Sequence, residues 1–123
     1  MNVQAVLNEL SVKYPGKTII KNDEESPTEI LCEIEPTSGH PDYSLAVSVI
    51  DKSIPHTHKN LTEIYKVVRG KLKLSVDNKI IKLSEGEEYT IKPGQTHWAE
   101  GNETWIECYS RPGWIPDDHI LAK

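Results

Sequence analysis

The stretch Pro55-His56-Thr57-His58-Lys59-Asn60-Leu61-Thr62-Glu63 decides how the rest of the chain is interpreted. In an extended strand, side chains two positions apart point to the same side, so the imidazoles of His56 and His58 can meet at one point. The residues between His58 and Glu63 allow a bend that returns the Glu63 carboxylate to that point. His97 follows a Pro-Gly turn and can add a third imidazole from another strand.

Three imidazoles and one carboxylate form a donor set that suits transition metals of borderline softness. We therefore expect one divalent transition-metal ion (Fe, Mn, Ni, Zn, Co or Cu) bound by His56, His58, Glu63 and His97. A single histidine in a strand is usually a packed or solvated residue. That interpretation would here have to explain three histidines and a carboxylate in one pattern.

Short alternating segments surround this stretch and predict an antiparallel all-β fold. Residues 29–35 place Ile30, Cys32 and Ile34 on one face and three glutamates on the other. The pair Asp77-Asn78 predicts a two-residue hairpin, because asparagine tolerates a positive φ. The other expected strands are 18–20, 44–50, 63–69, 71–76, 79–83, 87–91, 97–100 and 104–110, with a turn at Gly101-Asn102 between the last two.

The N-terminal residues predict a short amphipathic helix over residues 2–13. Apolar side chains recur there at helical spacing, and Asn2 is a suitable N-cap. This helix can cover the outside of a sheet, a sheet edge or a subunit contact. We expect a single domain over residues 1–123, with the barrel at about 28–110 and a tail at 111–123.

Composition restricts the partners of the protein. The chain has 123 residues and a formal net charge of -5, which argues against a nucleic-acid backbone as partner. It has no basic block for an anionic membrane and no apolar stretch near the ~20 residues of a membrane span. We expect a cytoplasmic protein in which Cys32 and Cys108 are reduced, mostly buried thiols.

The pattern also resembles a known family. The run His56-x-His58-x4-Glu63-x6-Gly70 resembles the first cupin motif, and Gly86-x5-Lys92-Pro93-Gly94-x2-His97 resembles the second. Lys92 replaces a usual proline, and the asparagine expected after the last histidine falls one place late, at Asn102. The resemblance implies a cupin-type jelly-roll β-barrel of antiparallel strands, with the four residues named above holding the metal.

Cupins are chemically diverse, so the resemblance does not identify the reaction. The favoured interpretation is an enzyme that acts on a sugar, sugar acid or keto acid, with the metal as a Lewis acid in isomerisation or epimerisation. Alternation suggests Tyr65, Glu107 and Tyr109 as pocket residues that move a proton. The alternatives are an iron-dependent dioxygenase and a non-catalytic cupin that binds a small molecule or metal.

Several other polar residues are expected to lie on the surface without a functional role. His40 in a loop and His119 in an acidic tail are expected to be solvated surface histidines. The lysines around the Asp77-Asn78 hairpin are expected to face outward and to discourage edge pairing. A small jelly-roll leaves apolar surface to cover, so a homodimer is the expected assembly.

Overall fold

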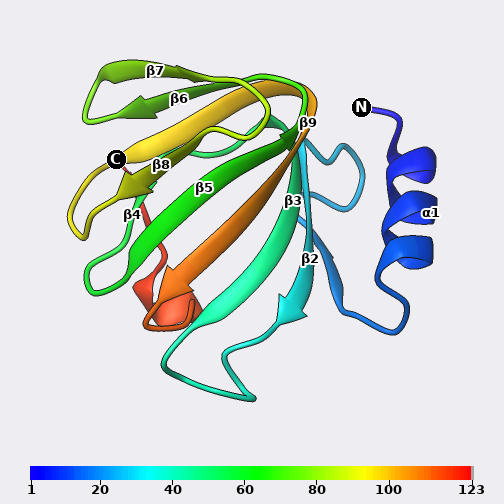
Figure 1. The fold of residues 1–123 in the computed structure, drawn as a ribbon, viewed down its shortest axis with the longest axis horizontal. Coiled ribbons are helices and arrows are strands. Elements are labelled where there is room, and N and C mark those ends of the chain that lie inside the picture. Colours follow the sequence, from blue (N-terminus) through cyan, green and yellow to red (C-terminus); the bar gives the residue numbers. More distant parts are fainter. Residues whose placement is uncertain (123) are drawn as a thin grey trace.

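The computed structural model describes residues 1–122, which form one antiparallel ten-stranded sheet curled into a half-barrel, with a helix on its outside (Figure 1). This confirms the expected all-β, jelly-roll-type fold with a short N-terminal helix. The elements are α1 (Val3–Lys13), β1 (Ile19–Lys21), β2 (Glu29–Glu35), β3 (Ser44–Lys52), β4 (His56–Thr57), β5 (Thr62–Arg69), β6 (Leu72–Val76), β7 (Lys79–Leu83), β8 (Glu88–Ile91), β9 (His97–Arg111), the 3₁₀ helix η1 (Pro116–Asp118) and β10 (Ile120–Leu121).

Strand β9 organises the sheet, because it pairs with β3, β4, β5 and β6 along its length. The predicted turn at Gly101-Asn102 is wrong: β9 continues through a bulge there, opposite a register shift between Ile50 and Lys52 of β3. A Cβ on Gly101 would lie 2.7 Å from Thr104 Cβ, so only glycine fits this close approach. The bulge lets one strand bend around the barrel.

The outer face of β2, β3 and β9 is apolar and lies under α1 (Figure 1). Leu10 of the helix is fully buried in the same cluster as Val49 and Trp105. The Arg69 guanidinium donates to both carboxylate oxygens of Glu9, at 2.9 and 3.0 Å, and lies over the Trp105 ring. The Asn2 side chain accepts a hydrogen bond from the Ala5 amide, which confirms the predicted N-cap.

The inner face of the sheet is apolar at one end of the barrel and polar toward the other. At the apolar end, the side chains of Val67, Leu74 and Ile106 are fully buried. The alternation predicted for β2 is present, but Ile30 and Cys32 lie under the helix. Glu29, on the opposite face of β2, therefore points into the barrel, whereas Glu35 at the end of the strand is exposed.

The predicted hairpin at Asp77-Asn78 joins β6 and β7, and both residues have positive φ, at 49° and 67°. At the other end of the chain, β10 pairs with β4, with Leu121 opposite His56. The tail after β9 thus returns to the strand that carries the first histidine. Both cysteines are free, Cys32 buried and Cys108 partly buried.

Candidate metal centre

Four side chains from three strands and a loop meet at the polar end of the barrel. His56 lies in β4 directly opposite His97, the first residue of β9. His58 follows β4, and Glu63 lies in β5. One ligand atom from each of these four residues lies within 4.8 Å of the others, and all four residues are buried. The site predicted from spacing is therefore assembled by the fold.

Backbone carbonyls select the tautomer of all three histidines. Nδ1 lies 2.7 Å from the Ile54 oxygen in His56, 2.7 Å from the Asp118 oxygen in His58, and 3.1 Å from the Gln95 oxygen in His97. A carbonyl oxygen only accepts, so each Nδ1 carries the hydrogen and donates. Each neutral ring then presents the lone pair of Nε2, which is the arrangement that metal-ligating histidines require.

The Nε2 atoms face a carboxylate rather than a donor. Glu63 Oε1 lies 3.3 Å from Nε2 of His97 and 3.5 Å from Nε2 of His58. Within residues 1–122, His58 Nε2 is buried without a hydrogen-bond partner. Two acceptors facing each other in a buried site are unfavourable unless a proton or a cation lies between them. The donor set therefore fits a divalent transition metal.

The pKa values of Glu63, His56 and His58 depend on their burial and on their distances from neighbouring donor residues. Burial raises the pKa of the Glu63 carboxyl, but the neighbouring imidazoles of His58 and His97 lower it by a larger amount, so the net pKa falls below its ordinary value. Burial, with the charge of His97, lowers the pKa of His56 to about 3. Burial lowers the pKa of His58, but the Glu63 carboxylate outweighs it and the net pKa is raised. His56 is thus neutral near pH 7, as a ligand should be.

Among the suggested pocket residues, the structure brings only Tyr65 to this site. Tyr65 is 4% exposed, and its ring centre lies 6.0 Å from that of His97. Burial raises the pKa of its phenol well above the ordinary value, so the hydroxyl keeps its proton. Its inward position follows from β5, where Glu63 and Tyr65 share one face.

The expectation that Glu107 and Tyr109 line the cavity is wrong. Their neighbours on β9 point inward: Ile106 lies in the inner core, and the Ser110 hydroxyl donates to Glu63 at 3.5 Å. Alternation then directs Glu107 and Tyr109 outward, and the Tyr109 hydroxyl accepts a hydrogen bond from exposed Arg111. The aliphatic face of β9 packs inside the barrel, not outside it.

Glu29 is a residue of the inner face that the sequence analysis did not single out. It lies on the inner face of β2, where its carboxylate accepts a 2.7 Å hydrogen bond from the Ser48 hydroxyl. Burial raises the pKa of this carboxyl, and the charge of Glu63 raises it further. The alternation of β2 was the available signal, but it does not say which face of the strand points inward.

Two tail residues were also missed. His119 was expected to be a solvated surface histidine, but its ring stacks on His56 with ring centres 4.3 Å apart. Asp118 is 4% exposed, and its carboxylate accepts hydrogen bonds from the amides of residues 59–61. The hydrogen bond between His58 and Asp118 joins positions 60 residues apart in the sequence, so no local sequence pattern predicts it.

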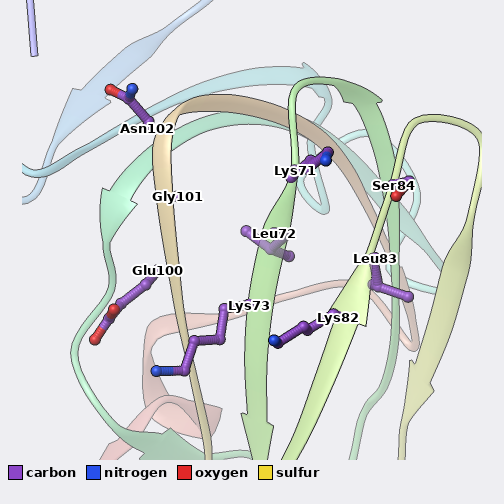
Figure 2. A pocket seen from close by; sticks show the side chains of 9 residues that line it. All are labelled: Lys71, Leu72, Lys73, Lys82, Leu83, Ser84, Glu100, Gly101 and Asn102. Atoms are coloured by element: carbon purple, nitrogen blue, oxygen red, sulfur yellow. The ribbon is translucent and has the colours of Figure 1, made fainter.

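A surface hollow lies away from these residues. It has a volume of about 460 Å³ and is lined by the β6–β7 hairpin and the start of β9, including Lys71, Lys73, Lys82 and Glu100 (Figure 2). None of the four donor residues lines it. The lysines point to solvent around an open groove, so we assign the chemistry to the buried donor set instead. Of the helices in residues 1–122, none is long and apolar enough to cross a membrane.

Comparisons with known proteins give a family match and similar folds. A family model described as a cupin domain matches residues 47–106, a segment that contains all four donor residues. A search of curated proteins finds no significant match. Among solved structures, Streptomyces PAC13 with uridine superposes with a TM-score of 0.77 at 11% identity, over 89% of this chain and 88% of that one.

Two further structures show the same fold. A cupin-2 domain protein from Rhodospirillum rubrum gives a TM-score of 0.74 at 14% identity, over 89% of this chain and 78% of that one. KdgF from Halomonas sp. gives 0.65 at 19% identity, over 77% of this chain and 87% of that one. At these identities the likeness concerns the fold and not the activity.

Proposed function

This chain carries a cupin domain, and from its donor set we propose that it is a metal-dependent enzyme acting on a small, oxygen-rich molecule such as a sugar, sugar acid or keto acid. The observation that carries the proposal is the tautomer of the histidines. Three backbone carbonyls hold the Nδ1 hydrogens of His56, His58 and His97, so three Nε2 lone pairs and the Glu63 carboxylate converge.

The proposed reaction is an isomerisation or epimerisation. When bound, a divalent metal supplies a Lewis acid that polarises a carbonyl or hydroxyl oxygen of the substrate. The chain's own residues must then orient the substrate and carry a proton. Tyr65 is a buried hydrogen-bond donor beside His97 and is suited to fixing a substrate oxygen. Tyr65 therefore stays a proposed pocket residue, but as a group that binds the substrate rather than one that moves a proton.

Glu29 replaces Glu107 and Tyr109 as the proposed proton carrier. Its buried carboxyl group has a raised pKa and is fixed by the Ser48 hydroxyl on the inner face of the sheet. A carboxyl group in such surroundings exchanges a proton more readily near neutral pH than an exposed one. An enzyme that shifts a carbon-bound proton needs a group of this kind inside its pocket.

Metal analysis tests the first half of the proposal. Protein purified without a histidine tag should contain about one transition-metal ion per chain, or take one up from Fe²⁺, Mn²⁺, Ni²⁺, Zn²⁺, Co²⁺ or Cu²⁺. Metal at 100 times its Kd should then stabilise the fold by about 2.7 kcal/mol. A protein that neither contains metal nor is stabilised by it would rule the proposal out.

Solvent exchange tests the second half. Metal-loaded protein is incubated in D₂O with a panel of sugars, sugar acids and keto acids, and proton NMR follows new isomers and deuterium uptake at carbon. Glu29→Gln should reduce the exchange rate by about 10²-fold or more, the range for loss of a general acid–base group. Oxygen consumption without isomerisation would instead favour the dioxygenase alternative. No turnover of the panel, with metal bound, would favour a binding role.

A further inference from the structure

The tail that carries His119 is fixed on both sides of that residue. Before it, the Asp118 carboxylate accepts hydrogen bonds from the backbone amides of Lys59 at 2.7 Å and Leu61 at 3.0 Å. After it, the Ala122 amide donates to the Pro55 carbonyl at 3.0 Å. These contacts join the tail to the loop that carries His58. The position of His119 is therefore set by the fold of the site itself.

The imidazole of His119 lies against the metal ligands. Its ring stacks on His56, with centres 4.3 Å apart and planes 22° from parallel. Its centre is 5.7 Å from that of His58 and 5.9 Å from that of Trp114. The Trp114 and His56 rings thus flank His119 within the polar end of the barrel.

One nitrogen of His119 has no partner. In the part of the chain that the structure describes, Nδ1 is buried and makes no hydrogen bond. Leaving such a group unsatisfied is unfavourable, so a buried unpaired nitrogen needs an explanation. The other buried unpaired side-chain atom among residues 1–122 is Nε2 of His58, one of the four metal donors. Both atoms belong to one site.

His119 does not act as a fifth metal ligand in this arrangement. The donor atoms that lie within 4.8 Å of one another come from His56, His58, Glu63 and His97, and the group of described residues does not include a nitrogen of His119. Its missing partner is therefore better explained by a molecule bound beside the ligands. One carboxylate neutralises only half the charge of a divalent ion, so the remaining positive charge attracts an anion.

We propose that His119 contacts the bound substrate, holding a small anionic group beside the metal ligands through a hydrogen bond that its unpaired Nδ1 donates. A carboxylate is the natural anion of this size in the sugar acids and keto acids considered above. The inference rests on the proposed metal centre and narrows its substrate class to anions. It also gives the tail a role in recognition.

The test uses the full chain loaded with Co²⁺ and titrated with azide as the anion probe, followed by visible absorption. In His119→Ala, the Co²⁺ affinity should fall by a smaller factor than the azide affinity, because no ligand is lost. Azide should bind about five- to tenfold more weakly, as expected for one lost hydrogen bond. His119→Gln should recover part of the azide affinity, because its amide can still form that bond. His40→Ala, a matched change at a histidine that stacks on Tyr43 instead, should change neither value.

The outcomes separate this inference from the proposed function. A parent protein that does not bind Co²⁺ contradicts the metal centre itself. A parent that binds Co²⁺ but not azide, or equal azide affinities in parent and His119→Ala, overturns only the role of His119. A 100-fold loss of Co²⁺ affinity in His119→Ala would mean that His119 acts on the metal site itself rather than on the anion, and would overturn the inference as well. His119→Gln decides the case if the alanine variant does not fold.

Discussion

The two faces of the sheet formed by β2, β3 and β9 differ in what they do. The outer face is apolar and buried under α1, with Leu10 and Trp105 in its cluster. The inner face toward the metal centre carries Glu29, Ser48 and Ser110. The Ser48 hydroxyl donates a hydrogen bond to the Glu29 carboxylate, and the Ser110 hydroxyl donates to that of Glu63. One face stabilises the fold, while the other holds polar groups that are costly to bury. The polar face is therefore the one to examine for function.

The largest effect should come from removing a ligand on the inner side. His97→Gln should lower Co²⁺ affinity by more than about 100-fold, because even changes to groups that only orient ligands cost about 10–100-fold. Competition with a chromophoric chelator measures this affinity. His40→Gln is the control and should bind Co²⁺ like the parent. Unchanged affinity in His97→Gln would mean that the inner face does not carry the metal centre.

A cavity on the outer side should affect stability alone. Leu10 is fully buried under the sheet, so Leu10→Ala should lower the free energy of unfolding by about 2–5 kcal/mol. Urea unfolding measures the loss, and Co²⁺ affinity should stay within threefold. Val12→Ala on the same helix is the control, since Val12 is 80% exposed and should change stability by less than about 0.5 kcal/mol. A large loss of metal affinity in Leu10→Ala would show that the two faces are coupled.

A smaller effect is expected from the residue that holds the ligand loop. Asp118→Ala should lower Co²⁺ affinity by about 10–100-fold, because the amides of residues 59–61 lose their common acceptor. Hydrogen exchange at those amides should also become faster. Asp117→Ala removes the same charge from the exposed neighbour and should change the affinity less than about twofold. Equal effects in the two variants would point to net charge rather than to positioning.

The smallest effect concerns the buried acid of β2. The folded-state pKa of Glu29 is raised, so the folded state binds its proton more tightly than the unfolded state. Stability from this group is present at low pH and is lost as pH rises above the ordinary value of 4.5. Glu29→Gln should therefore gain stability relative to the parent as the pH is raised from 4 to 8.

Urea unfolding of the metal-free proteins at the two pH values measures this difference. Glu25→Gln is the control, because Glu25 is exposed and should show no pH-dependent gain. A Glu29→Gln variant that loses stability relative to the parent between pH 4 and pH 8 would contradict the sign worked out here. It would then place the Glu29 carboxylate among the groups that stabilise the inner face.

Two incorrect predictions from the sequence concern which face of a strand points into the barrel. Alternation in β2 and β9 correctly separates the two faces, but it does not say which face the barrel encloses. An apolar face normally turns inward, and here helix α1 offers it a second place of burial. This is why Glu29 was not expected inside the barrel. The prediction for Glu107 required the aliphatic face of β9 to pack outward, whereas Ile106 of that face lies in the inner core. His119 escaped prediction for a different reason, since its neighbours come from distant segments of the chain.

The sequence by itself determined the antiparallel fold, the hairpin at Asp77-Asn78, the N-terminal helix and the four donor residues. Each of these follows from the spacing of residues within one segment or from two motifs at matching intervals. Such spacing can be obtained directly from the amino-acid sequence. Only the tertiary structure decided which tautomer each histidine adopts, which face of β2 lines the barrel, and that Asp118 and His119 complete the site. These depend on contacts across up to about 60 residues, which form only when the sheet curls and the tail returns to β4.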